Sequence, residues 1–168
     1  EIGTNRGGMF YLLCSISSPN GIKISLDLPH SIFGNNDFVV EARNAQINKT
    51  FKEAKFINGD SRKKESKDQV KNILQGEKLD LLFIDGDHRY DSVSSDWEMY
   101  KDLVKDNGFI VFHDINDSER ARAKKCEVGI FWKDLKGTKI EFNEKKYWAG
   151  IGIIINNEKM MKKDKNSS

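Results

Sequence analysis

The chain has 168 residues, with 28 Lys and Arg against 26 Asp and Glu and a net charge of +2. This length indicates one domain with a hydrophobic core, and the balanced charge lacks the basic excess of a nucleic-acid-binding protein. No apolar run approaches the roughly 20 residues of a membrane span, and no signal peptide is visible. We therefore expect neither a nucleic-acid partner nor membrane association. Cys14 and Cys126 stand far apart, which favours a reducing, cytoplasmic compartment.

The first segment, residues 1–8, reads EIGTNRGG. Glu-Ile-Gly-Thr has the form of the end of a strand, so we expect that further sequence precedes residue 1. A strand end followed by glycines and a helix lets the backbone approach a ligand closely. We expect that helix over residues 9–17, with Pro19-Asn20-Gly21 ending it.

A second strand is predicted over residues 21–28, where Ile22, Ile24 and Leu26 alternate with polar residues. Asp27 lies at its end, about 20 residues after the glycine loop, where an acidic residue commonly binds ribose hydroxyls. The alternative is a turn aspartate before Pro29. Asn35 or Asn36 can then cap a helix, whose predicted inner face is Phe38, Val39, Ala42, Ala45 and Gln46.

A third strand is predicted over residues 54–58, and Gly59-Asp60-Ser61 follow it. Asp60 and Ser61 can contact an adenine ring, and a plain loop is an equally good interpretation. The charged segment 63–75 predicts a solvated helix, with Val70, Ile73 and Leu74 facing inward.

The most informative stretch is 79–91, LDLLFIDGDHRYD. Its continuous apolar run predicts a strand buried on both faces, as in a parallel sheet. Asp85, Asp87 and His88 follow where that strand ends, and ligands of open α/β sheets bind at such ends. A turn explains the glycine and one aspartate, but it does not explain two carboxylates and an imidazole together.

The remaining segments predict further alternation. A helix is expected over 90–105, with Tyr90, Val93, Trp97, Tyr100 and Val104 as its inward stripe. The apolar residues 109–112 predict a strand that ends in His113-Asp114. A mobile loop over 116–125, a helix over 128–135, and paired antiparallel strands over 138–142 and 149–155 complete the order.

The predicted fold is therefore α/β, a Rossmann-like three-layer sandwich. Its mostly parallel, seven-stranded sheet would end in an antiparallel hairpin, and its first strand would be truncated. We expect one domain over residues 1–157 and a frayed, Lys-rich tail over 158–168.

These motifs together resemble a known family. EIG with Gly7-Gly8, Asp27, Asp60, FIDGDHRY, GFIVFHDI, GIFWKDLKG and the closing hairpin are similar to class I S-adenosylmethionine-dependent methyltransferases. More narrowly, they resemble methyltransferase family 24, which includes cephalosporin-hydroxylase-like proteins and relatives of macrolide-sugar O-methyltransferases. The resemblance covers nearly the whole chain and implies S-adenosylmethionine as cofactor, with a small-molecule or sugar hydroxyl as acceptor.

The resemblance also implies roles for individual positions. Glu1, Gly3 and Gly7 would line the methionine part of the cofactor, Asp27 would bind the ribose, and Asp60 with Ser61 would flank the adenine. Asp85 would lie at both the cofactor and a metal ion.

In metal-dependent relatives the ligands correspond to Asp85, His113 and Asp114, and the catalytic base corresponds to His88. Those relatives usually have an acidic residue where this chain has His113. Mg²⁺ prefers oxygen ligands and imidazole suits softer metals. Three alternatives stay open: Mg²⁺ bound without His113, a manganese-like ion, or no metal and a His88–His113 acid–base pair.

Two other functions are carried forward. A NAD-dependent Rossmann oxidoreductase is disfavoured because the glycine spacing is not G-x-G-x-x-G and the hairpin does not belong to that fold. A degenerate, non-catalytic cofactor-binding protein also stays open. The acceptor and the oligomeric state, a homo-oligomer included, have no readable code in the sequence.

Overall fold

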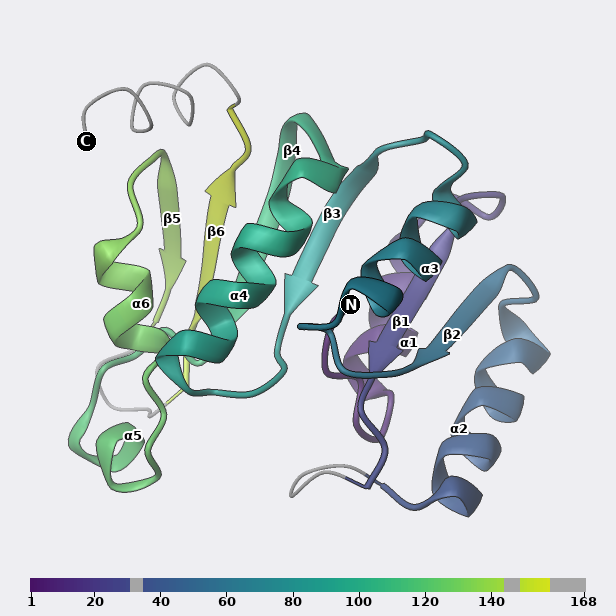
Figure 1. The fold of residues 1–168 in the computed structure, drawn as a ribbon, viewed down its shortest axis with the longest axis horizontal. Coiled ribbons are helices and arrows are strands. Elements are labelled where there is room, and N and C mark those ends of the chain that lie inside the picture. The colour runs from purple at the N-terminus through teal and green to yellow at the C-terminus, as the bar shows by residue number, and fades with distance from the viewer. Residues whose placement is uncertain (31–34, 144–148, 158–168) are drawn as a thin grey trace. The chain divides into compact units, whose positions relative to one another are not determined.

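The computed structural model describes residues 1–30, 35–143 and 149–157 (Figure 1). The chain divides into two compact units, Glu1–Glu77 and Lys78–Ser168. The expected frayed tail lies outside the described residues, and the expectation of one domain over 1–157 stays a prediction.

The first unit is built on a short parallel sheet. Strand β1 (Lys23–Asp27) pairs in parallel with β2 (Ala54–Asn58), from Lys23↔Ala54 to Asp27↔Asn58. Ile2 forms one further parallel bridge with Leu26. The helices of this unit are α1 (Gly8–Ile16), α2 (Asp37–Thr50) and α3 (Lys64–Leu74).

Local sequence explains where the first helices begin. The N–H of Gly7 donates to the carbonyl of Thr4 at 2.8 Å, and Gly7 has φ 82°, a conformation that glycine adopts readily. This turn leads directly into α1. As expected, Asn36 caps α2, because its side-chain oxygen accepts from the N–H of Val39 at 3.0 Å.

The buried face of α2 differs from the predicted one. Its buried residues are Val40, Arg43 and Ile47, whereas Phe38 is 79% exposed. Ala42, Ala45 and Gln46 are exposed as well. The prediction was wrong because the inner stripe includes a charged residue, Arg43, which finds an ionic partner inside the unit.

The second unit contains a four-stranded sheet in the order β3-β4-β6-β5. Strand β3 (Leu79–Ile84) is parallel to β4 (Val104–His113). Strand β6 (Ile151–Ile155) is antiparallel to both β4 and β5 (Lys139–Phe142). The closing antiparallel hairpin is therefore confirmed.

The single seven-stranded sheet that we predicted is not what the described residues form. They make a two-stranded and a four-stranded sheet. The expected first strand contributes only the Ile2–Leu26 bridge, because the chain turns at Thr4–Gly7 into α1. The α/β class and the parallel order of the main strands are as expected.

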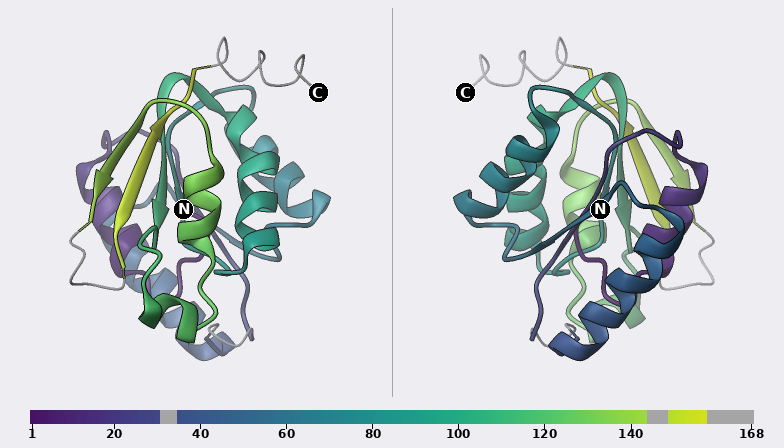
Figure 2. Two further views of the ribbon diagram at one scale, coloured as in Figure 1. Left: turned by 90° about the vertical axis from the view of Figure 1, so that its left-hand side faces the viewer. Right: turned by 90° about the vertical axis from the view of Figure 1, so that its right-hand side faces the viewer.

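Two helices cover one face of the four-stranded sheet (Figure 2). They are α4 (Tyr90–Tyr100) and α6 (Val128–Asp134). Phe112 of β4 packs under them, with ring centroids 5.9 Å from Trp97, 5.8 Å from Phe131 and 5.7 Å from Trp132. This aromatic core fixes the end of β4, and with it the residues that follow.

Three boundaries in this unit differ from the prediction. The helix that begins at Tyr90 ends at Tyr100, and a 3-10 turn (Lys101–Leu103) leads into β4, so Val104 is a strand residue. The strand pairing shifts between Leu79↔Val104 and Leu81↔Phe109, which leaves a polar bulge. The segment expected to be a mobile loop contains α5 (Glu119–Ala123), which Ser118 caps.

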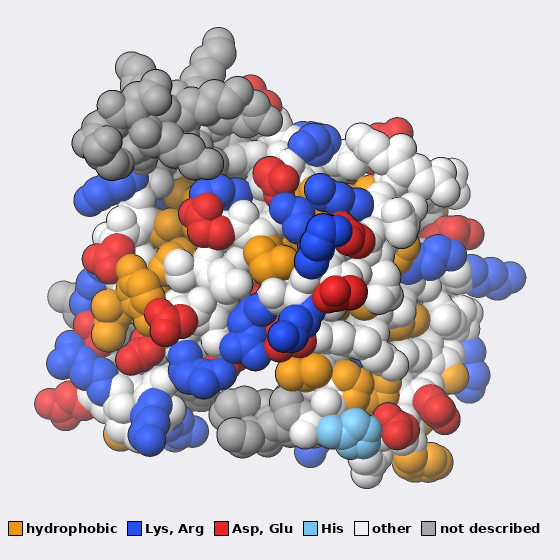
Figure 3. Space-filling model, viewed as in Figure 1, with side chains coloured by type: hydrophobic (Ala, Val, Ile, Leu, Met, Phe, Trp, Pro, Cys, Tyr) orange, Lys and Arg blue, Asp and Glu red, His pale blue; other side chains and the backbone are white. Residues whose placement is uncertain are grey.

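Acidic and basic side chains intermingle on the face drawn in Figure 3, in keeping with a net charge of +2. Within the described ranges, none of the helices combines the length and apolar character needed to cross a bilayer.

Candidate functional site

Strands β3 and β4 deliver a cluster of ionisable side chains to one edge of the second unit. Their parallel register pairs Ile84 with Phe112, so Asp85 and His113 come at matching positions where the strands end. Asp114 follows immediately. Ligand sites of α/β sheets form at this edge.

The side chains of Asp85, His113 and Asp114 converge closely. Nδ1 of His113 lies 3.2 Å from Oδ1 of Asp85 and 3.1 Å from Oδ1 of Asp114. One potential ligand atom from each residue lies within 4.8 Å of the others. The structure thus brings together the three residues that the sequence analysis assigned to one metal site, and their role as ligands stays a prediction.

Two atoms of this cluster are buried without a well-aligned hydrogen bond among the described residues. They are Nδ1 of His113 and Oδ1 of Asp114, even though their separation is short. An unsatisfied buried polar atom is costly. Octahedral ligands about 2.1 Å from one ion lie about 3 Å apart, so the donors and their spacing fit a divalent cation.

The charges of the cluster are strongly coupled. Asp114 and then Asp85 raise the pKa of His113 to about 10. Burial raises the pKa of Asp85, but contacts from His113 and His88 outweigh it, so the pKa of this carboxyl lies below its usual value. Without a metal ion, a protonated imidazole therefore balances the carboxylates.

The backbone of Asp114 is held in an uncommon conformation. Its φ of 61° lies in the left-handed region, and the residue is only 1% exposed. A non-glycine residue there costs on the order of 1 kcal/mol, and such strain is concentrated at functional sites.

His88 approaches the same cluster from the loop between β3 and α4. Its Nε2 lies 3.4 Å from Oδ2 of Asp114 and 3.7 Å from Oδ1 of Asp85. Asp85 raises the pKa of His88, and burial opposes this effect. Four residues that the sequence selected thus come together: Asp85, His88, His113 and Asp114.

Asp87 serves the loop rather than the cluster. Its carboxylate accepts hydrogen bonds from the backbone N–H of Arg89 at 3.2 Å and from the hydroxyl of Ser92 at 2.9 Å. Burial raises the pKa of Asp87, while the bonds from Arg89 and Ser92 lower it below its usual value. For this one aspartate the turn interpretation is adequate.

Cys126 was missed as a site residue in the sequence. It lies between α5 and α6, is 4% exposed, and shares a group of potential ligand atoms within 4.8 Å with His88 and Asp114. Burial raises the pKa of its thiol. The spacing along the chain gives no signal, because the partners are 12 and 38 residues away.

One of the cofactor residues predicted in the first unit, Asp27, is a member of a buried ion pair. Asp27 ends β1, and its Oδ2 accepts from Nη1 of Arg43 at 2.7 Å, with side chains only 8% and 4% exposed. The same Nη1 donates to the carbonyl of Asn5 at 2.5 Å. A Cβ on Gly7 would lie 2.9 Å from Cγ of Arg43. Arg43, which sequence reasoning did not select, therefore joins the glycine loop to Asp27.

Glu1 and Gly3 bond to β1 through the backbone. The carbonyl of Glu1 accepts from the N–H of Leu26, and the N–H of Gly3 donates to the carbonyl of Leu26, each at 2.9 Å. These bonds hold the first residues alongside β1, next to Asp27.

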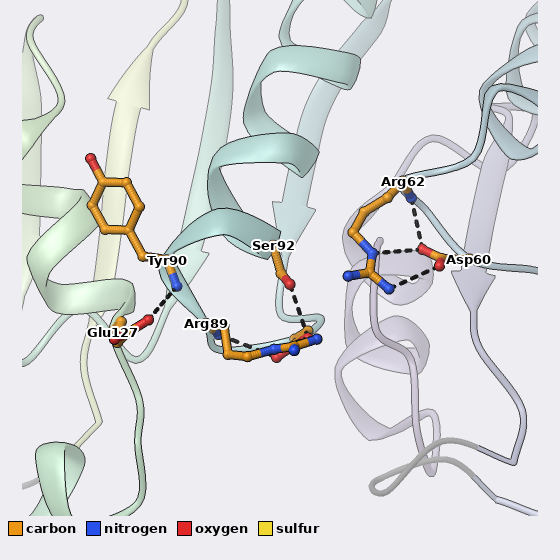
Figure 4. Close-up of polar contacts among 7 residues, drawn as sticks. Asp60, Arg62, Arg89, Tyr90, Ser92 and Glu127 are labelled. Carbon is orange, nitrogen blue, oxygen red and sulfur yellow. Dashed lines mark hydrogen bonds and ion pairs between the residues drawn. The ribbon is translucent and has the colours of Figure 1, made fainter.

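Asp60 lies in the turn after β2. The N–H of Gly59 donates to the carbonyl of Asp27 at 2.8 Å, which keeps this turn beside the end of β1. The carboxylate of Asp60 accepts from the backbone and guanidinium of Arg62 (Figure 4). These bonds lower the pKa of Asp60. Ser61 follows in the same turn, which the N–H of Lys63 closes on the carbonyl of Asp60 at 3.0 Å.

A family model described as "Methyltransferase domain", that of methyltransferase family 24, matches residues 1–115. Among curated proteins, an uncharacterized protein of Acanthamoeba polyphaga mimivirus is 49% identical over 39 residues. That match spans 23% of this chain and 18% of the viral protein, well under two thirds of its length.

Solved structures share the fold. An O-methyltransferase from Bacillus cereus in complex with SAH superposes with a TM-score of 0.65 at 16% identity, covering 93% of this chain and 72% of the other. A cofactor-bound protein from MTB gives 0.64 at 19%, covering 94% and 71%. The O-methyltransferase TomG from Streptomyces achromogenes, involved in tomaymycin synthesis and solved with SAM, gives 0.63 at 15%, covering 93% and 71%. At such identities the likeness establishes the fold.

Proposed function

Because this chain belongs to the methyltransferase-domain family whose model matches residues 1–115, we propose that it transfers a methyl group from S-adenosylmethionine to a hydroxyl of a small molecule or sugar. The observation that supports oxygen as the acceptor atom is the cluster of Asp85, His88, His113 and Asp114 at the ends of β3 and β4. A hydroxyl is a poor nucleophile near neutral pH, and this cluster offers both a base and a cation site.

Cofactor binding is proposed for the first unit. The glycine loop with Gly3 and Gly7 would hold the methionine end, Asp27 the ribose, and Asp60 with Ser61 the adenine. Arg43 supports this arrangement, since it ties the loop carbonyl of Asn5 to the Asp27 carboxylate. Within the part of the chain that the structure describes, the Arg43 contact uses Oδ2 of Asp27, which would leave Oδ1 for a ribose hydroxyl.

Asp85, His113 and Asp114 would hold a divalent cation. A bound cation supplies Lewis acidity, which lowers the pKa of a hydroxyl near it. In the chain itself, Asp85 and Asp114 provide the negative charge that such an ion needs, and His113 contributes one nitrogen. This donor set suits Mn²⁺ at least as well as Mg²⁺.

The proton of the acceptor hydroxyl would go to Nε2 of His88. As this proton leaves, the hydroxyl oxygen forms a bond to the methyl carbon, the carbon–sulfur bond breaks, and S-adenosylhomocysteine departs. Asp85 and Asp114 flank Nε2 at 3.7 and 3.4 Å and stabilise the imidazolium that forms. The chain otherwise has to position the reactants in line.

The first experiment is calorimetric titration of S-adenosylhomocysteine into the chain, with Mg²⁺, with Mn²⁺ and with a chelator. Micromolar binding, with no binding of NAD under the same conditions, is the expected result. Binding of NAD instead would favour the oxidoreductase, and absence of both would contradict cofactor use by this chain.

The role of His88 is tested by turnover of S-adenosylmethionine over a panel of sugars and other hydroxylated acceptors. His88→Ala should lower methyl transfer by about 10²- to 10⁴-fold, the range of general-base catalysis, while S-adenosylhomocysteine still binds. His30→Ala is the matched control, because His30 is 61% exposed in its side chain and contacts Asp37 in the first unit. Equal rates for His88→Ala and the parent chain would exclude His88 as the base.

A further inference from the structure

Cys126 belongs to a second group of potential metal ligands, which we call the thiol cluster: His88, Asp114 and Cys126. The three residues follow β3, follow β4 and precede α6, respectively. One nitrogen, one carboxylate oxygen and one sulfur lie within 4.8 Å of one another. The cluster shares Asp114 with the Asp85–His113–Asp114 set.

The residue after Cys126 fixes the thiol beside His88. The N–H of Glu127 donates to the carbonyl of His88 at 2.8 Å, and the Glu127 carboxylate accepts from the N–H of Tyr90 at 2.8 Å (Figure 4). Glu127 therefore forms hydrogen bonds to two points of the loop that contains His88, one through its backbone and one through its side chain. The N–H of Cys126 itself donates to the carbonyl of Ala121 at 2.9 Å.

A second constraint fixes the thiol beside Asp114. A Cβ on Gly129, in the first turn of α6, would lie 2.7 Å from the backbone nitrogen of Asp117 and 2.8 Å from the carbonyl oxygen of Ile115. Only glycine allows this approach of α6 to the segment after Asp114. Sγ of Cys126 accordingly lies 4.0 Å from the Asp114 carbonyl oxygen.

A buried cysteine is most often a small apolar core residue, and the chain contains one of that kind. Cys14 of α1 packs with Phe10, Ile47 and Ala54. Cys126 is as well buried as Cys14, at 4% against 2% exposure, but its neighbours are an imidazole and a buried carboxylate. The two cysteines thus differ in chemistry and not in burial.

We propose that His88, Asp114 and Cys126 bind a zinc-class cation through nitrogen, oxygen and sulfur. Borderline-soft ions such as Zn²⁺ and Co²⁺ accept this donor set, whereas Mg²⁺ does not take sulfur ligands. Three protein ligands leave a fourth position open, as in catalytic zinc sites. On binding, the sulfur–hydrogen bond of Cys126 breaks, its proton passes to solvent and the sulfur lone pair binds the ion. The inference shares Asp114 and His88 with the proposed function, and the His88 nitrogen that binds the ion cannot at the same time take the proton of the acceptor.

Cobalt is the probe, because a thiolate ligand gives Co²⁺ a sulfur-to-metal charge-transfer band in the near ultraviolet. The full chain is reduced, stripped with a chelator and titrated with Co²⁺. We expect the band to appear, to disappear on adding Zn²⁺, and to survive an excess of Mg²⁺. Cobalt binding without the band, or no cobalt binding at all, would overturn the proposal.

Matched variants assign the sulfur. Cys126→Ser should lose the band, and Cys14→Ser, which changes the apolar cysteine, should keep it. His88→Gln retains the thiol and should weaken Co²⁺ binding on the order of 100-fold, by loss of one ligand. This second variant keeps the test decisive even if Cys126→Ser does not fold. A band that survives Cys126→Ser, or unchanged affinity in His88→Gln, contradicts the assignment.

Calorimetry with S-adenosylhomocysteine on the same sample separates the two proposals. Cofactor binding without a thiolate band would contradict the zinc-class site and leave the methyltransferase proposal intact. A thiolate band without cofactor binding would contradict the methyltransferase proposal and leave the zinc-class site intact.

Discussion

Arg43 neutralises the carboxylate of Asp27 at the end of β1. Its guanidinium and the Asp27 carboxylate are both almost fully buried, and each is the other's ionic partner. Removing one member of a buried pair leaves the other charge unpaired in the protein interior, which solvates it poorly. This lowers the free energy of unfolding by about 3–5 kcal/mol. The pair is therefore a structural requirement of the candidate cofactor site as well as a part of it.

Arg43→Met should lower the free energy of unfolding by about 3 kcal/mol, because it leaves Asp27 buried without its partner. Urea denaturation followed by far-ultraviolet circular dichroism measures this. Arg62→Met is the matched control, since the Asp60–Arg62 pair is 21% and 40% exposed and its loss should cost about 1 kcal/mol or less. Equal losses in the two variants would show that the Arg43 pair contributes no more than a surface contact.

The glycines at 7 and 8 should respond oppositely to alanine. Gly7 has φ 82° and no room for a Cβ beside Arg43, so Gly7→Ala should destabilise by about 2 kcal/mol. Gly8 begins α1 with nothing within 4 Å of its Cβ position, so Gly8→Ala should be neutral or stabilise by up to about 1 kcal/mol. The same denaturation curves test both, and the interpretation of the loop fails if Gly7→Ala is the milder change.

Single elements show where sequence patterns succeed. The span 54–58 was predicted to the residue, and the closing hairpin was confirmed, because apolar runs bounded by turn residues mark strands clearly. The inner face of α2 could not be predicted, because hydrophobic periodicity assigns no inward position to Arg43. The start of β4 was hidden by Lys105, Asp106 and Asn107, which form its polar bulge.

The residues of the candidate site likewise divide into those that sequence patterns could select and one that they could not. Asp85, His113 and Asp114 were selected correctly as neighbours because each follows an apolar strand, and parallel strands end at one edge. Cys126 reaches the same place through α5, α6 and the Glu127 contacts. These tertiary contacts have no periodic signature, so sequence reasoning had nothing to detect.

Asp117 links the segment after β4 to two helices, and this link should depend on pH. Its carboxylate accepts from Arg122 of α5 at 2.7 and 2.9 Å and from Lys133 of α6 at 2.5 Å. These partners hold the pKa of Asp117 far below its usual range. A carboxyl group whose pKa is lower in the folded state stabilises the fold at any pH above its pKa in the unfolded state, which is about 3.9. This stabilisation is lost as the pH falls through the pKa of the folded state.

Near pH 7 the parent chain should therefore have a higher melting temperature than Asp117→Asn. The difference between the two melting temperatures, here called the gap, should narrow as the pH falls below about 4. Thermal melting across pH 3–7 measures the gap. Asp80→Asn breaks an exposed pair with Lys105 in the same unit and should shift the midpoint by less than about 2 °C. A gap that stays constant or widens on acidification would contradict the role given to Asp117.

At the scale of the whole molecule, the residues proposed to bind the cofactor and those proposed to bind the cation belong mostly to different units. The residues proposed for S-adenosylmethionine are mostly in Glu1–Glu77, and those proposed for the cation are in Lys78–Ser168. A ligand at 100 times its Kd stabilises the bound state by about 2.7 kcal/mol, which slows amide exchange through local opening by about 100-fold. Exchange can therefore locate each ligand in the intact chain without any knowledge of the methyl acceptor.

Hydrogen exchange with S-adenosylhomocysteine should slow amides at 3–7 and 58–61 by at least tenfold. Mn²⁺ alone should slow amides at 85–89 and 113–117, whereas Zn²⁺ alone should slow those at 85–89, 113–117 and 126–129. Mass spectrometry of peptic fragments resolves these segments. Strand β5 contains none of the proposed ligand residues and is the internal control, expected to change less than about twofold. Protection by S-adenosylhomocysteine that left 3–7 and 58–61 unchanged would remove the cofactor from the first unit. Protection by Zn²⁺ that covered 113–117 but spared 126–129 would leave the Asp85–His113–Asp114 set and exclude the thiol cluster.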